Sequence, residues 1–295
     1  MSWLQFIIET DTSTVETISD GLFAIGAVSV SLSDALDQPL YEPPLNTTPL
    51  WEHTQLVGLF EGDTDSTQLQ NQLQAVIAPL ILPPSQIKKL AAKDWSRVWM
   101  DNFQPMLFGK RIWICPSWLA PPQPQAINIL LEPGLAFGTG THPTTALCLE
   151  WLDEQTDLSA KTLIDYGCGS GILAITAAKL GATHVWAVDN DPQALSATEN
   201  NAQKNNVNTV MNWVLPSLLP NFKADGILAN ILANPLIKLA ETFAAHLKTN
   251  APLVLSGILK EQSDDVIVAY APFFKITEIV ERDGWVRIVA TLNPH

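Results

Sequence analysis

Long apolar runs are missing from this sequence of 295 residues. No stretch reaches the about 18 consecutive apolar residues that a membrane-spanning helix needs, so we expect no such helix. The amino terminus, MSWLQFIIETD, lacks a basic start, and its apolar stretch is too short for a signal peptide. We therefore expect a cytoplasmic protein whose length suffices for one large domain and a smaller companion.

Cysteine and basic residues are also scarce. The cysteines, Cys115, Cys148 and Cys168, are odd in number and lack the spacing of metal ligands, which predicts free thiols in a reducing compartment and no metal site. Sixteen Lys and Arg residues stand against thirty Asp and Glu residues, which gives a net charge of -14. Because tight binding to nucleic acid needs clustered cations, this composition argues against direct nucleic-acid binding and favours a basic partner.

Residues 1–93 predict a small α+β domain of the ferredoxin-like kind. Strand-like and helix-like patterns follow one another in the order βαββαβ. This segment holds 11 acidic and 3 basic residues, so its surface is the most acidic part of the chain. Such a domain more often binds or presents a partner than carries chemistry, although an acidic surface also serves solubility alone.

A linker helix is expected over residues 94–106, where aromatic residues recur at every fourth position. From residue 161 onward, strand, turn and helix alternate, which is typical of a parallel, doubly wound sheet with helices on both faces. The last two strands are joined by ERDG and predict an antiparallel hairpin at the sheet edge. Residues 107–295 should therefore form a single α/β domain.

The segment LIDYGCGSG follows a strand and opens a helix. Gly167, Gly169 and Gly171 let the backbone approach a ligand closely, and the helix N-terminus offers N–H groups to its polar part. Dinucleotide-binding dehydrogenases use a glycine turn as well. The G-x-G-x-G spacing, with Asp165 two residues before the first glycine, resembles instead the turn of Rossmann-like methyltransferases that use S-adenosylmethionine.

That resemblance implies a carboxylate at the end of the next strand, where such methyltransferases hold the ribose hydroxyls. HVWAVDND places Asp189 at that strand end. A carboxylate can accept two short hydrogen bonds from a vicinal diol. Asp191 competes for the role, but its place before Pro192 suits a helix cap better.

The fourth strand of the domain ends in ANILANP. In amine methyltransferases of this fold, the acceptor nitrogen meets the methyl group at this strand end, often at an N-P-P-Y motif. Here the Asn is kept as Asn230, and Ala233 replaces the aromatic residue. An Asn side chain can accept a hydrogen bond from an incoming N–H, so Asn230 is the candidate that positions the amine. Without an aromatic platform, we expect an aliphatic amine as acceptor.

The segments EPGLAFGTGTHPTT, DYGCGSGILAI, AVDNDPQAL and ANILANPL together resemble the PrmA family, whose members methylate protein eleven of the large ribosomal subunit. The resemblance covers the whole chain and implies a class I methyltransferase fold with a seven-stranded sheet. It further implies in-line transfer of methyl groups from S-adenosylmethionine to the α-amine and lysine ε-amines of that basic protein, docked on the front domain. The implied cofactor contacts fall on Thr145, Gly167, Asp189 and Asn230.

The segment LLEPGLAFGTGTHPTT, residues 130–145, is expected to be a lid over the methionine end of the cofactor that feeds a helix beginning at Pro143. Lid or pocket candidates are Phe137, Thr141 and Thr144. His142 is a candidate general base because its ordinary pKa lies near neutrality. A capping or packing role competes with catalysis for this residue.

The sequence leaves three alternatives open. A methyltransferase of the same fold would act on another protein or on a small-molecule amine. A nicotinamide-dependent oxidoreductase would also use a glycine turn, and a non-catalytic module would only bind a ribosomal protein. We expect a monomer in each case.

Overall fold

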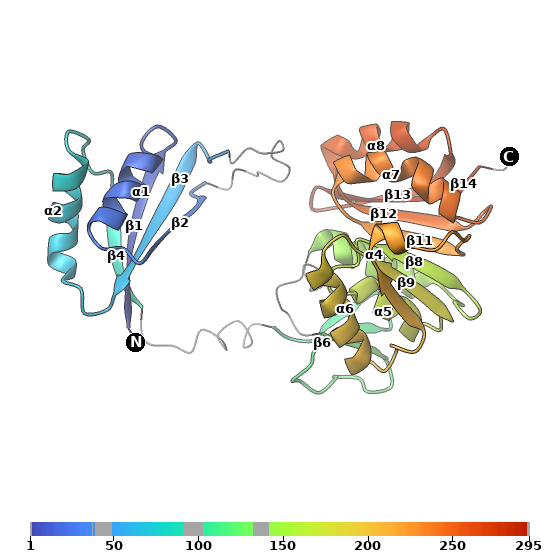
Figure 1. Cartoon of the computed structure of the whole chain (residues 1–295). Coiled ribbons are helices and arrows are strands. Elements are labelled where there is room, and N and C mark those ends of the chain that lie inside the picture. The colour runs from blue at the N-terminus through green and yellow to red at the C-terminus, as the bar shows by residue number, and fades with distance from the viewer. Residues whose placement is uncertain (1, 37, 39–48, 91–102, 132–141, 294–295) are drawn as a thin grey trace. The chain divides into compact units, whose positions relative to one another are not determined.

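The computed structural model describes residues 2–36, 38, 49–90, 103–131 and 142–293. The chain divides into two compact units, Met1–Asn102 and Phe103–His295, which are described separately (Figure 1). Most of the expected linker helix, 94–106, lies outside the described residues, and residues 103–105 have no regular structure. The boundaries expected at 93 and 107 stay predictions.

The first unit is a four-stranded antiparallel sheet with two helices on one face. Its elements are β1 (Trp3–Asp11), α1 (Val15–Ala24), β2 (Ser29–Asp34), β3 (His53–Glu61), α2 (Ser66–Ile77) and β4 (Ser85–Leu90). The strands lie in the order β2-β3-β1-β4, and every neighbouring pair is antiparallel. This order confirms the predicted ferredoxin-like α+β domain.

Alternation along β1 places both helices on the same face of this sheet. Leu4, Phe6 and Ile8 are fully buried and share one core with apolar residues of α1 and α2. The intervening side chains of β1 are only half buried. The sheet therefore has one face that packs on helices and one face that neither α1 nor α2 covers.

The second unit contains a seven-stranded sheet between two layers of helices (Figure 1). Its elements are β5 (Met106–Phe108), β6 (Ile112–Pro116), β7 (Ile127–Leu131), α4 (Pro143–Glu154), β8 (Thr162–Tyr166), α5 (Ile172–Lys179), β9 (His184–Val188), α6 (Pro192–Lys204), β10 (Met211–Val214), β11 (Gly226–Asn230), α7 (Ala233–His246), β12 (Pro252–Leu259), α8 (Ser263–Tyr270), β13 (Phe274–Arg282) and β14 (Trp285–Leu292). Two 3₁₀ turns, Pro216–Leu218 and Lys260–Gln262, precede β11 and α8.

The large sheet has the order β10-β9-β8-β11-β12-β14-β13. Strands β8 to β12 are mutually parallel, and β14 is antiparallel to both of its neighbours. The predicted doubly wound sheet and the C-terminal hairpin at its edge are both confirmed. The chain leaves β8 toward β10 and returns on the other side at β11, so the strand order reverses between β8 and β11. Ligands of open α/β sheets bind outside the carboxyl ends of strands at such a reversal.

The two faces of this sheet carry different helices. Helices α4, α5 and α6 share a core with the face that carries Leu163 and Val254, and α7 and α8 share a core with the face that carries Ile164 and Leu255. No helix within the described ranges is long and apolar enough to cross a membrane.

Helix α8 and strand β5 were not predicted from the sequence. The segments GKRIWICPSW and AINILLE are predicted strands and form β6 and β7, but their pairing with β5 in a separate small sheet was not predicted. Helix α8 has eight residues and buries only Val266 and Tyr270, a single i, i+4 pair, so no helical period is visible in its sequence. Tyr270 fixes this helix against α7, because its hydroxyl donates to the Leu236 carbonyl at 2.9 Å.

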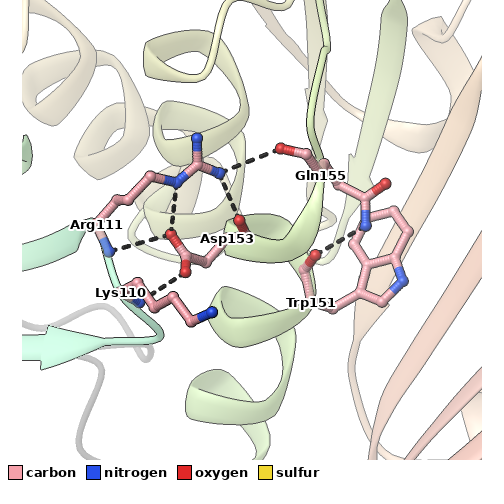
Figure 2. Close-up of polar contacts among 5 residues, drawn as sticks. All are labelled: Lys110, Arg111, Trp151, Asp153 and Gln155. Atoms are coloured by element: carbon pink, nitrogen blue, oxygen red, sulfur yellow. Dashed lines mark hydrogen bonds and ion pairs between the residues drawn. The ribbon is translucent and has the colours of Figure 1, made fainter.

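One buried carboxylate ties the end of α4 to the turn between β5 and β6 (Figure 2). Asp153 accepts hydrogen bonds from the backbone N–H groups of Lys110 at 2.6 Å and Arg111 at 3.2 Å, and from Arg111 Nε at 3.1 Å. The Arg111 guanidinium also donates to the carbonyls of Asp153 and Gln155. At Gly109 φ is +60°, and a Cβ there would lie 2.6 Å from Asp153 Cγ. The turn therefore needs glycine beside this carboxylate.

Replacing Asp153 by alanine is expected to lower the free energy of unfolding by about 1–3 kcal/mol, because two backbone N–H groups of the exposed turn lose their buried acceptor. The Arg111 side chain is 45% exposed, so water screens its ion pair with Asp153. The ion pair therefore contributes only a small part of this loss of stability. Urea unfolding followed by tryptophan fluorescence measures the change. Glu154→Ala, at the exposed next position, is the control and should shift stability by less than about 0.5 kcal/mol. Equal shifts for the two variants would contradict the expectation.

Candidate active site

The carboxyl ends of β8, β9 and β11 meet where the strand order reverses. A glycine turn follows β8, Asp189 follows β9, and Asn230 ends β11. The glycine turn, Asp189 and Asn230 therefore lie at neighbouring strand ends, whereas His142, Thr144 and Thr145 lie at the start of α4. Of the three lid or pocket candidates, Phe137 and Thr141 lie outside the described residues, as does most of the expected lid over 130–145, whereas Thr144 is buried in the first turn of α4.

The glycine turn adopts backbone conformations that require glycine. Gly167, Gly169 and Gly171 have φ values of +82°, +54° and +79°. A Cβ at Gly167 would overlap Cγ2 of Ile231, and one at Gly171 would lie 2.9 Å from side-chain atoms of Thr198. The turn is thus a cradle of bare backbone, and it opens helix α5 with Gly171 at the N-cap.

Neighbouring elements hold this turn in place. The N–H groups of Gly167 and Cys168 donate to the Val188 carbonyl at 2.7 and 3.0 Å. From α6, the Thr198 hydroxyl donates to the Gly169 carbonyl at 3.1 Å, and Asn201 Nδ2 donates to the carbonyl of Ser170 at 2.9 Å. No sequence pattern pointed to Thr198 or Asn201, since both look like ordinary polar residues of an amphipathic helix.

Asp189 is half buried beside the glycine turn. One carboxylate oxygen accepts from the Gly169 N–H at 2.9 Å, and the other accepts from the Asp191 N–H at 3.0 Å. Each carboxylate oxygen has two lone pairs, so both oxygens of Asp189 can accept a further hydrogen bond from a ligand. Asp191 itself caps α6, because its side chain accepts from the Gln193 N–H at 2.8 Å. The cap predicted for Asp191 is therefore confirmed.

A second carboxyl group, Asp165, lies behind the turn and is only 1% exposed. Oδ2 accepts from the Ala174 N–H at 2.9 Å, whereas Oδ1 is buried without a partner among the described residues. Burial, together with the charge of Asp189, raises the pKa of Asp165 to about 7. The site therefore contains a carboxyl group that is partly protonated at neutral pH.

Thr145 and Asn230 come together although 85 positions separate them. Asn230 Nδ2 donates to the Thr145 Oγ1 at 3.2 Å, and Thr145 is fully buried in the first turn of α4. This hydrogen bond uses one of the two N–H groups of the Asn230 amide and leaves its carbonyl oxygen available as an acceptor. It therefore fixes the orientation of the Asn230 side chain at the end of β11.

His142 is the N-cap residue of α4, and helix α4 begins at Pro143 as predicted. Nδ1 of His142 lies 2.8 Å from Oγ1 of the buried Thr144 and accepts from the Thr144 N–H at 3.4 Å. The ring packs edge-on against Trp285 at a centroid distance of 4.7 Å, and burial lowers the pKa of His142. These contacts favour the capping and packing role that competed with catalysis in the sequence.

The residues at these strand ends fit S-adenosylmethionine. The glycine turn presents backbone without side chains, since a Cβ at Gly167 or Gly171 would collide with Ile231 or Thr198. The half-buried Asp189 carboxylate suits a diol, and the unpartnered Oδ1 of the buried Asp165 lies behind the turn. Gly167, Gly169, Gly171 and Asp189 would hold the nucleoside and amino-acid parts, with Thr145 and Asn230 next to them. No group of three His, Cys, Asp or Glu side chains in the described ranges is placed to hold a metal ion.

The strand order, the glycine turn and the two carboxylates define a class I methyltransferase that uses S-adenosylmethionine. Comparison with known proteins narrows the class. The model of the family "Ribosomal protein L11 methyltransferase (PrmA)" matches residues 2–293, and the chain belongs to this family. The resemblance found in the sequence is thereby confirmed, and the oxidoreductase and the non-catalytic module are ruled out.

Individual relatives agree with the family assignment. The chain is 51% identical over 289 residues to the ribosomal protein L11 methyltransferase of Pseudomonas aeruginosa strain LESB58, covering 98% of both chains. It is 53% identical, with the same coverage, to that of Pseudomonas syringae pv. tomato. The crystal structure of a ribosomal protein L11 methylase from Lactobacillus delbrueckii subsp. bulgaricus superposes with a TM-score of 0.60 at 32% identity, over 65% of this chain and 100% of that one.

Proposed function

We propose that this chain transfers methyl groups from S-adenosylmethionine to the α-amine and lysine ε-amines of ribosomal protein L11. The family to which the chain belongs supports the substrate. The observation that carries the reaction is the Asn230–Thr145 hydrogen bond at the end of β11, next to the glycine turn. It leaves the Asn230 carbonyl oxygen to receive an N–H group beside the cofactor cradle.

When bound, S-adenosylmethionine supplies a methyl group on a positively charged sulfur, which an amine attacks in line. The chain has to hold the amine and favour its neutral form. A free lysine has a pKa of about 10.4, and its cation has no lone pair for the attack. Ile231, which follows Asn230, packs its Cγ2 against the glycine turn, and a poorly hydrated surrounding lowers an amine pKa. Nδ1 of His142 accepts a hydrogen bond in the cap of α4, which argues against its use as a general base. Catalysis by His142 therefore stays a prediction.

The fourth position of the ANILANP motif supports an aliphatic acceptor. Ala233 is 2% exposed and starts helix α7, so it presents no ring on which a flat base or amide could stack. A flexible lysine side chain or an α-amine needs no such platform. Another methyltransferase substrate, a different protein or a small-molecule amine, is the alternative that the same site would serve.

We also propose that the acidic first unit docks the substrate, on the sheet face that α1 and α2 leave open. Ile7 and Val57 are paired across β1 and β3, point to that face and are half buried. Glu9 and Glu61 lie exposed on the same face near the strand ends. Lys88 of β4, which pairs with Gln5, is exposed on this face as well. An apolar centre whose rim carries more acidic than basic side chains fits a basic protein such as a ribosomal protein.

Val57→Lys is expected to raise the KM for the ribosomal protein by about tenfold without changing kcat, because a cation on this face repels a basic partner and breaks its apolar centre. Steady-state kinetics with varied protein substrate measure both constants. Val76→Lys on α2, where the side chain is already 50% exposed, is the matched control and should leave KM unchanged. Equal KM values for the two variants would show that the substrate docks on another surface.

The substrate assignment is tested with labelled S-adenosylmethionine and total ribosomal proteins, followed by mass spectrometry of the labelled band. We expect label on protein L11 at amines only, and none after its amines are acetylated. Cofactor binding without label on any protein band would refute a protein substrate and favour a small-molecule amine. A cytoplasmic site of action and a monomeric state stay proposals, in keeping with a ribosomal substrate and with three buried, free cysteines.

A further inference from the structure

A β-bulge in β12 lies beside the end of β11. β12 pairs with β14 up to Leu255 and again from Ile258, opposite Ile288 and Val286. β12 therefore uses one residue more than β14 between these pairs, which is the mark of a bulge. The extra residue falls at Ser256 and Gly257, and φ of Gly257 is +84°.

Gly257 brings β12 against the peptide of Ile231, the residue after Asn230. A Cβ at position 257 would lie 2.7 Å from the carbonyl carbon and 3.0 Å from the amide nitrogen of Ile231. The Ile231 N–H donates to the Ser256 carbonyl at 3.1 Å. The bulge therefore holds this peptide from one side, at a distance that only glycine permits.

The glycine turn holds Ile231 from the other side, since a Cβ at Gly167 would overlap Ile231 Cγ2. Ile231 thus fills the space between the bulge in β12 and the turn after β8. Asn230, directly before it, is fixed through this backbone and through its side-chain bond to Thr145. The separation between Asn230 and the glycine turn is therefore set by Ile231 and by the Ser256–Gly257 bulge that contacts its peptide.

Ser256 ties the same bulge to helix α4. The side chain of Ser256 is fully buried, and its hydroxyl lies 3.3 Å from the carbonyl oxygens of Thr144 and Val286. A hydroxyl has one proton, so it donates to one of these carbonyls at a time. Thr144 precedes Thr145, so the bulge also braces the turn that carries the partner of Asn230.

We propose that the Ser256–Gly257 bulge is a positioning element for methyl transfer, which sets the place of Asn230 relative to the glycine turn. The inference rests on the proposed role of Asn230 in holding the amine. Gly257 acts through Ile231 and is a positioning residue. A misplacement of about 1 Å at a reacting centre can lower the rate by about 100-fold, so a clash that moves the Ile231 peptide should reach the chemistry.

The test compares Gly257→Ala with Gly284→Ala. Gly284 has nearly the same φ, +77°, but nothing lies within 4 Å of an added Cβ, so this control carries the backbone strain without the clash. We expect Gly257→Ala to lower kcat by about tenfold or more at saturating substrates, with the cofactor Kd changed by less than about threefold. Gly284→Ala should keep the wild-type kcat. Calorimetry gives Kd, and thermal melts show that both variants are folded at the assay temperature.

A merely structural glycine would lower the melting temperature and leave the kcat of the folded fraction unchanged, which overturns the proposal. If Gly257→Ala is not recovered folded, Ile231→Ala loosens the same loop from the glycine-turn side and should lower kcat with an unchanged Kd. An unchanged kcat for Ile231→Ala would also overturn the proposal. Absence of methyl transfer by the wild-type chain would instead refute the proposed function, so the two failures are distinguishable.

Discussion

Asp189→Ala is expected to weaken the binding of S-adenosylmethionine by about 100-fold or more. Hydrogen bonds to a charged acceptor are worth about 1.5–3 kcal/mol each, and a ribose diol would lose two of them. The same substitution removes the acceptor of the Gly169 N–H, so the cradle loses one of its own ties. Both losses act on the cofactor, and neither depends on which amine is methylated.

Isothermal titration calorimetry of cofactor with the apoprotein measures this effect directly. Asp191→Asn is the matched control, because it removes a carboxylate two residues away while Asn still caps α6. Its Kd should stay within about threefold of the wild-type value. If Asp191→Asn weakened binding and Asp189→Ala did not, the ribose would have to be assigned to Asp191.

The grouping of the glycine turn, Asp189 and Asn230 at one sheet edge could be predicted because each is a local pattern at a strand end. A glycine turn, an acid after the next strand and an Asn after the fourth are each visible within about ten residues of sequence, and a parallel sheet brings such ends to one edge. The hydrogen bond between Asn230 and Thr145 was not predicted, although both residues were singled out. It depends on how α4 packs against β11, which no local pattern encodes.

Other features that depend on tertiary packing were not predicted for the same reason. The bulge at Gly257 exists only because β12 pairs with β11 on one side and β14 on the other, and the sequence shows a lone glycine within an apolar strand. The tie between Asp153 and Arg111 joins residues 42 positions apart. Asp165 was read as part of the glycine motif, while its burial and its unpartnered oxygen follow from tertiary packing alone.

The free energy of unfolding is expected to fall between about pH 4 and about pH 7 because of Asp165. Its pKa is raised by burial from the ordinary 3.8 to about 7 in the folded protein. Over this interval the unfolded chain has already released the proton that the folded chain still binds, so rising pH favours unfolding. The contribution of Asp165 to the free energy of unfolding is fully present below the pKa of the unfolded chain. It is lost as the pH rises through the pKa of the folded protein. From pH 5 to pH 7 the loss approaches about 2–3 kcal/mol.

Asp165→Asn isolates this contribution, because the amide resembles the protonated acid in shape and cannot ionise. Urea unfolding of the apoprotein at pH 5, 6, 7 and 8 should show the wild type losing stability relative to Asp165→Asn as pH rises. Asp264→Asn, an exposed position on α8, is the control and should follow the wild-type profile. Parallel profiles for Asp165→Asn and wild type would mean that the folded carboxyl titrates as it does in the unfolded chain. A buried acid that weakens the apoprotein at neutral pH is consistent with the proposal that the neighbouring glycine turn holds a cationic ligand.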